Sequence, residues 1–220
     1  QVGPDYPGFL CKHVKTDTGA PALFSTGCAG DVRPWFKKEG ATGFLRPSLQ
    51  ELESAGARMA REVLSSRLGA VPIESDRLQV DHVFHRLPYQ ELPTREELLC
   101  ETDSDDPRAR DWSAAMLRRL DSGGLADACP HEVQVLQLNP DFRIVFLGGE
   151  VLSEIGLHIK QYLAPATTVT VAYANGLIAY VPSAKAHPLG GYEVESSHRY
   201  FLRPAAFTAD IEPLIIETVG

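Results

Sequence analysis

The last third of the chain contains the pattern that most constrains its fold. Phe142–Leu147 is a short apolar run, Val151–Leu163 has apolar residues at helical spacing, and Thr167–Ala174 is rich in β-branched residues. A strand, a helix and a second strand in that order form a crossover unit with two parallel strands. Another apolar run, Val133–Leu138, precedes them across the turn sequence Asn139-Pro140-Asp141. We therefore expect an α/β (mixed α+β) fold, in which layered mixed β-sheets pack against helices.

Capping signatures and periodicity predict the other elements. Ser48 with Glu51, and Thr94 with Glu97, form the S/T-x-x-E signature that begins many helices. In chain order we expect an irregular segment over residues 1–20, a strand at Ala22–Thr26, a mixed loop at Asp31–Pro47, a helix from Ser48 to about Leu68, a strand at Leu78–Leu87, a short helix after Thr94, a helix at Asp105–Leu120 and a closing helix or strand at Ile211–Val219. We expect the helical region at about 90–125 to be an insertion lying over the core.

Composition and charge exclude several classes of function. The net charge of −8 argues against nucleic-acid binding, which needs clustered Lys and Arg. No apolar run approaches the ~20 residues that span a bilayer, so we expect a soluble chain without a transmembrane segment. The four cysteines are scattered and form no C-x-x-C pair, which argues against a disulfide framework or a zinc knuckle. Compartment and oligomeric state remain open.

The chain opens at Gln1 without a methionine or a signal peptide. We take this as an indication of a fragment or a processed product.

Two tyrosines, Tyr180 and Tyr192, lie in the segment Asn175–Glu193, N-G-L-I-A-Y-V-P-S-A-K-A-H-P-L-G-G-Y-E. Its glycines and prolines fix an irregular path directly after a predicted strand. Most such segments are plain loops, but irregular backbone leaving a rigid strand is also where sites are often built.

Two further segments contain residues suited to chemistry. Glu150 lies behind Gly148-Gly149 where a strand gives way to a helix, so its carboxylate can bind a metal, act as a base, or only complement the helix N-terminus. The segment G-C-A-G-D-V-R-P turns tightly and carries Asp31 and Arg33. These residues can help hold an anion, or they only organise the loop.

The histidines form no metal motif. His82 and His85 are three apart on a predicted strand, so they point to opposite faces and are not expected to share a metal. His187 lies between the two tyrosines and can reach the same cavity. The others are expected to be surface or packing residues: His13, His131, His158 and His198.

Three segments in order resemble the N-terminal catalytic domain of the neutral/alkaline (non-lysosomal) ceramidase family. They are A-L-F-S-T-G-C-A-G-D-V-R-P, I-V-F-L-G-G-E-V-L-S-E-I-G and A-N-G-L-I-A-Y-V-P-S-A-K-A-H-P-L-G-G-Y-E-V. The sequence D-Y-P-G at Asp5–Gly8 also resembles a family segment upstream of the G-D motif. The resemblance spans nearly the whole chain, with little contribution from residues 70–130.

The resemblance implies a zinc-dependent hydrolase that cleaves the amide bond of N-acyl sphingosines, and so a role in sphingolipid metabolism. On the family pattern, Glu150 and Tyr180 match two zinc ligands, and Tyr192 matches a tyrosine that holds the reacting group of the substrate. Asp31 and Arg33 join Tyr192 in the expected catalytic set. Gly30 and Gly191 are the expected substrate-binding glycines. The expected partner is a small-molecule or lipid amide.

The chain departs from the family pattern at two points. A serine follows G-D-V in the ceramidases, and Arg33 stands there in this chain. The family's two histidine ligands lie upstream of the D-Y-P-G-like segment and would precede Gln1. Because catalytic zinc takes three protein ligands, the chain alone is not expected to hold zinc tightly.

We therefore expect residues 1–220 to be the C-terminal portion of one ceramidase-like catalytic domain in a distant, bacterial-type relative. Arg33 would contact an anionic part of the substrate. The alternative is a non-catalytic module of the same fold that binds lipid or carbohydrate.

Overall fold

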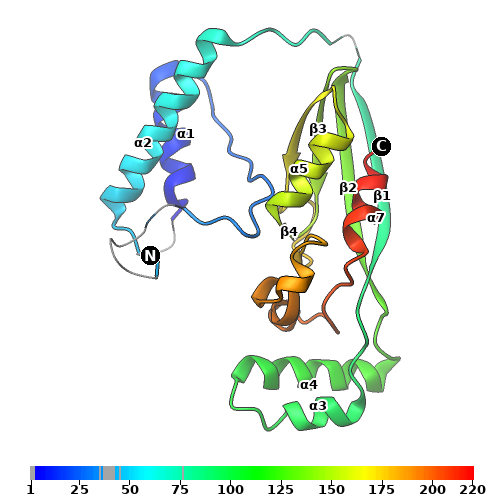
Figure 1. The fold of residues 1–220 in the computed structure, drawn as a ribbon. Coiled ribbons are helices and arrows are strands. Elements are labelled where there is room, and N and C mark those ends of the chain that lie inside the picture. The colour runs from blue at the N-terminus through cyan, green and yellow to red at the C-terminus, as the bar shows by residue number, and fades with distance from the viewer. Residues whose placement is uncertain (1–2, 35, 37–42, 45, 76) are drawn as a thin grey trace. The chain divides into compact units, whose positions relative to one another are not determined.

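The structure, a computed structural model, describes residues 3–34, 36, 43–44, 46–75 and 77–220 (Figure 1). It divides into two compact units. The first comprises Gln1–Ser25 and Arg33–Ile73, and the second comprises Thr26–Val32 and Glu74–Gly220. Much of the predicted loop Asp31–Pro47 lies outside the described residues.

The first unit is a pair of packed helices, α1 (Asp5–Thr18) and α2 (Leu49–Ser66), and a 3₁₀ turn, η1 (Arg67–Gly69), follows α2. The capping box predicted for α2 is confirmed, because the Ser48 hydroxyl accepts from the Glu51 N–H and the Glu51 carboxylate accepts from the Ser48 N–H.

Helix α1 shows that the prediction of an irregular segment over residues 1–20 is wrong. Proline and glycine, which are common in turns, stand at Pro4, Pro7 and Gly8. The first turn of a helix has no intrahelical use for its N–H groups, so proline is tolerated there. The helix ends at Thr18, and the following Gly19 adopts a left-handed conformation with φ of 73°.

The second unit is built on a four-stranded sheet in the order β1-β2-β3-β5. Its strands are β1 (Gln79–Pro88), β2 (Ala128–Asn139), β3 (Phe142–Leu147) and β5 (Thr167–Val171). The pairs β1–β2 and β2–β3 are antiparallel, whereas β3–β5 is parallel. The predicted mixed α/β fold and its crossover unit are therefore confirmed.

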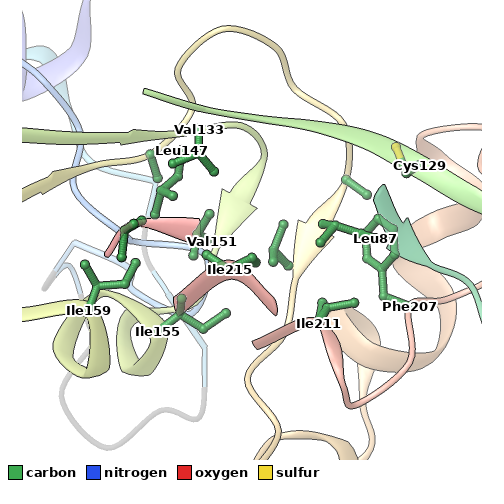
Figure 2. Close-up of a cluster of buried hydrophobic side chains, with 14 of the residues drawn as sticks. Leu87, Cys129, Val133, Leu147, Val151, Ile155, Ile159, Phe207, Ile211 and Ile215 are labelled. Atoms are coloured by element: carbon green, nitrogen blue, oxygen red, sulfur yellow. The ribbon is translucent and has the colours of Figure 1, made fainter. Parts of the chain in front are cut away.

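Helix α5 (Ser153–Tyr162) makes the crossover, and α7 (Ile211–Thr218) is the closing helix. Figure 2 shows the core that they share with the sheet. Its fully buried aliphatic side chains include Val133 and Leu147 from the sheet, Ile155 and Ile159 from α5, and Ile211 and Ile215 from α7. Burying such side chains stabilises the fold by about 1.5–3 kcal/mol each.

The predicted helices at about 90–125 are α3 (Arg95–Glu101) and α4 (Pro107–Ser122). Leu98 from α3 packs with Trp112, Ala115 and Met116 from α4 in a cluster separate from the main core. The sequence led us to expect that this pair lies over the core. In Figure 1 it lies instead beyond one end of β1 and β2. That these helices are an insertion stays a prediction.

The strand predicted at Ala22–Thr26 is absent from the structure, which describes the whole segment. The carbonyl of Thr26 accepts one hydrogen bond from the N–H of Ala172, at 3.0 Å. One such bond does not make a ladder. No helix in the described part of the chain is both long and apolar enough to cross a membrane.

Candidate functional site

A two-glycine turn places Glu150 at the end of the central strand β3. Gly149 has φ of 89°, and a Cβ atom there would lie 2.8 Å from the carbonyl oxygen of Ala179. The backbone of the turn donates two hydrogen bonds: the Glu150 N–H donates to Ala179 O at 2.8 Å, and the Gly149 N–H donates to Gly176 O at 2.8 Å. Only glycine combines this conformation with this approach.

Glu150 begins β4 (Glu150–Val151), which pairs in parallel with β6 (Tyr180–Val181). In this register Glu150 lies beside Tyr180. The ring of Tyr180 in turn meets the ring of Tyr192 edge-on, with centroids 5.5 Å apart. The pairing of β4 with β6 and the contact between the two rings thus bring together Glu150, Tyr180 and Tyr192, which the sequence analysis had named. We call Glu150, Tyr173, Tyr180 and Tyr192 the tyrosine cluster.

Tyr173, the fourth member, was missed by the sequence analysis. Its hydroxyl donates to Glu150 Oε2 at 3.3 Å. Its backbone has φ of 58°, in the left-handed region that bulky residues rarely adopt. The sequence does hold one signal: Tyr173 lies just before Asn175-Gly176, a dipeptide that favours positive φ.

The electrostatics of the tyrosine cluster keep its phenols protonated. Burial raises the pKa of Tyr180, and the hydrogen bond and charge of Glu150 raise it further. The pKa of Tyr173 is raised to about 12 by burial and then by the charge of Glu150. Burial, followed by the same charge, also raises the pKa of Tyr192. Each phenol is therefore a hydrogen-bond donor near one carboxylate, and a bound cation would favour ionisation.

Asp31 and Gly30 lie against the backbone around Glu150. A Cβ atom on Gly30 would lie 2.5 Å from the Glu150 carbonyl oxygen. Both carboxylate oxygens of Asp31 are occupied, one by the Ser153 N–H at 2.8 Å and the other by the Ser153 hydroxyl at 2.9 Å. Asp31 thus stabilises the first turn of α5, as acidic groups near helix N-termini do.

Arg33 belongs to the first unit, where its guanidinium lies over the ring of Phe44 at 5.2 Å. Its expected contact with substrate stays a prediction. Gly191 has φ of 100° and precedes η3 (Tyr192–Ser196), a π-helical turn that carries Tyr192. Its role in binding substrate also stays a prediction.

Two carboxylates that the sequence analysis passed over hold the loop that follows Tyr180. Glu154 of α5 accepts from the Ser183 hydroxyl at 2.7 Å and from Lys185 at 3.3 Å. Glu212 of α7 accepts from the Ala184 N–H at 2.6 Å and pairs with His158. The loop is thereby tied to both helices of the core.

The histidines of β1 are arranged as expected, since His82 and His85 point to opposite faces of the sheet. His82 pairs with Glu132 at 2.6 Å. His85 Nε2 meets His131 Nδ1 at 2.6 Å, and His131 Nε2 lies 3.0 Å from the carbonyl of Gly148. Since that carbonyl is an acceptor, His131 Nε2 carries the proton. His131 Nδ1 then accepts from His85 Nε2.

The donor set at Glu150 suits a cation but is incomplete. A carboxylate and a phenol provide two oxygen ligands, whereas a catalytic zinc takes three protein ligands. In the residues that the structure describes, no group of three or more His, Cys, Asp or Glu could hold a metal ion. Zinc therefore fits these residues only as half of a site.

A cavity of about 840 Å³ is lined by no residue of the tyrosine cluster. It is lined by α3, by Trp112 of α4, and by Glu195, His198 and Arg199, and it includes neither Glu150 nor Tyr180. His187 does not line this cavity, and its expected reach to a cavity at the two tyrosines stays a prediction.

No family model matches the chain, and no curated protein matches its sequence. Two solved structures share its fold. A neutral ceramidase from Pseudomonas aeruginosa superposes with a TM-score of 0.63 at 15% identity, over 99% of this chain and 40% of that one. A ceramidase complexed with C2 gives a TM-score of 0.60 at 12% identity, over 98% of this chain and 41% of that one. The chain thus has a ceramidase-like fold and spans about two fifths of the length of those proteins.

Proposed function

We propose that this chain is part of a zinc-dependent hydrolase that cleaves an amide bond of an N-acyl sphingosine or a related N-acyl substrate. One observation carries the proposal: Glu150 and Tyr180 are register partners in β4 and β6, with Tyr192 in contact with Tyr180. The fold shared with the two ceramidase structures supports it. At 12–15% identity, that likeness concerns the fold alone.

In this proposal Glu150 and Tyr180 provide two of the metal ligands, and protein outside the described residues provides the others. Zinc, when bound, lowers the pKa of a water molecule and polarises a carbonyl group. Tyr192 would orient the substrate by donating its O–H to the carbonyl oxygen, which its raised pKa permits at neutral pH. Gly30 and Gly191 would let the substrate approach the backbone. Asp31 would act by fixing α5 behind Glu150.

The metal assignment is tested by zinc content. The protein encoded by the complete open reading frame is purified, dialysed against zinc and analysed by atomic emission. We expect about one zinc per chain, and large losses in Glu150→Ala and Tyr180→Phe. Tyr162→Phe removes a phenol at the far end of α5 and should retain the metal. Equal zinc in all four proteins would overturn the assignment.

The alternative, a non-catalytic module that binds lipid or carbohydrate, is motivated by the incomplete ligand set at Glu150 in the described residues. Mass spectrometry of N-acyl sphingosines and other N-acyl amides incubated with the zinc-loaded protein separates the two. Release of fatty acid, lost in Tyr192→Phe, supports the hydrolase. Binding of these lipids without turnover supports the module.

A further inference from the structure

Tyr173 holds a backbone conformation that tyrosine does not favour. Apart from glycine, the described residues with positive φ are Asp5, Tyr173, Asn175 and Leu202. Asparagine and aspartate tolerate this region because their short side chains bond locally, whereas a tyrosine there is an outlier. Such outliers persist only where the surrounding structure enforces them, and they cluster at functional sites.

Backbone hydrogen bonds enforce the conformation. The Tyr173 N–H donates to Gly149 O at 3.0 Å, and the Ala174 N–H donates to Leu147 O at 3.1 Å. In return the Gly149 N–H donates to Gly176 O. The segment after β5 is therefore fastened to the same two-glycine turn that places Glu150.

The Tyr173 side chain follows the alternation of β5. Along β5 the buried side chains alternate, with Thr168, Thr170 and then Ala172 facing the core beside α5. Alternation turns residue 173 to the opposite face, and Tyr173 is exposed there. On that face the Tyr173 hydroxyl meets Glu150 Oε2.

Packing does not account for this arrangement. Tyr173 remains 38% exposed, so the strained backbone is not compensated by full burial of the residue. In this conformation Tyr173 makes a hydrogen bond to the one carboxylate of the tyrosine cluster.

We propose that Tyr173 is a positioning residue for Glu150, whose carboxylate it holds in a fixed rotation beside Tyr180. This inference rests on the proposed function, in which Glu150 is a metal ligand. Carboxylates that bind metals are commonly oriented by such outer hydrogen bonds, and loss of one typically lowers metal affinity 10- to 100-fold. Tyr173 acts through Glu150 and touches neither metal nor substrate.

The first test does not depend on zinc. Crystal structures are determined for the metal-free wild type, Tyr173→Phe and Tyr162→Phe. Tyr173→Phe keeps the ring and removes only the hydroxyl. We expect the Glu150 carboxylate to leave its wild-type rotamer, or to become disordered, in Tyr173→Phe and to stay in place in Tyr162→Phe. A Glu150 carboxylate that is unmoved in Tyr173→Phe would overturn the inference.

The second test titrates zinc alone into the protein from the complete open reading frame by calorimetry. We expect Tyr173→Phe to bind zinc about tenfold more weakly with an unchanged melting temperature, which a purely structural role would not produce. Tyr173→Asn, which suits the left-handed backbone and also lacks the phenol, should weaken zinc binding at least as much.

The two proposals fail in different ways. If Glu150→Gln binds zinc as well as the wild type, the metal site is wrong, and the crystal structures still decide whether Tyr173 holds Glu150. If Glu150→Gln loses zinc while Tyr173→Phe binds it as tightly as the wild type, the positioning role is wrong.

Discussion

Glu212 shows how one buried carboxylate can organise a distant loop. Glu212 is 5% exposed, and its carboxylate accepts from His158 Nδ1 at 2.5 Å and from the Ala184 N–H at 2.6 Å. These bonds link α7, α5 and the loop after β6. Hydrogen bonds that involve a charged group contribute more than neutral ones.

We expect Glu212→Ala to lower the free energy of unfolding by about 1–3 kcal/mol, because both donors lose their acceptor. Urea denaturation measures this. Glu217→Ala, on the exposed side of the same helix, is the matched control and should change stability by less than about 0.5 kcal/mol. Equal losses in the two variants would show that the contacts of Glu212 contribute nothing specific.

Single residues were predictable from the sequence where local pattern identified them. Glu150 follows two glycines at a strand end, and Tyr180 lies in an unusual loop, so both could be named in advance. Tyr173 and Glu212 could not, because their contacts join residues 23 to 54 positions apart. Asp31 could be named, but its bonds to Ser153, which show it stabilising α5, depend on folding.

At the scale of elements, the turn Gly148-Gly149 joins β3 to β4 and sets the direction of Glu150. We expect Gly149→Ala to be strongly destabilising, because its φ of 89° strains an alanine and its Cβ would lie 2.8 Å from Ala179 O. Gly124 is the matched control, with φ of 103° and nothing within 4 Å of a Cβ atom.

Gly124→Ala therefore reports the strain alone, about 1–2 kcal/mol. Gly149→Ala should cost about 1–3 kcal/mol more, because backbone must also shift. Both free energies come from urea unfolding of the purified variants. If the two alanine variants lose the same stability, the close approach to Ala179 is not important for the turn.

Elements with a complete local signature were predicted correctly. The capping boxes at Ser48 and Thr94 identified the starts of α2 and α3, and β-branched residues identified β5. The predicted helix Val151–Leu163 begins two residues later than expected, at Ser153, because Glu150 and Val151 pair with β6. That pairing is a long-range contact that periodicity does not reveal.

At the scale of the whole molecule, buried histidines link stability to pH. Burial, and then the charge of His85, lower the pKa of His131 to about 4, although its bond to Gly148 acts in the opposite direction. The pKa of His198 is also lowered to about 4, by burial and by the charge of Arg199. Burial lowers the pKa of His85. In the unfolded chain each histidine titrates near 6.5.

Between pH 6.5 and 4 the unfolded chain therefore binds more protons than the folded one. The free energy of unfolding must rise with pH across this window, and stability that is complete above pH 6.5 is lost as the pH falls toward 4. His131 alone accounts for about 3 kcal/mol of this loss. We therefore expect the protein to be most stable near neutral pH and to unfold at moderately low pH.

Urea unfolding at pH 7.5, 6.5, 5.5 and 4.5 measures the effect. His131→Gln removes the most buried of these histidines, and with it one proton from the difference between the two states. The variant will be less stable than the wild type at pH 7.5, because Gln does not reproduce both bonds of the ring. Its free energy of unfolding should nevertheless fall less steeply as the pH is lowered. The difference in slope from the wild type should correspond to about one proton. A variant whose curve runs parallel to that of the wild type would show that the pKa of His131 is the same in the folded and unfolded chain, and the predicted link to pH would be wrong.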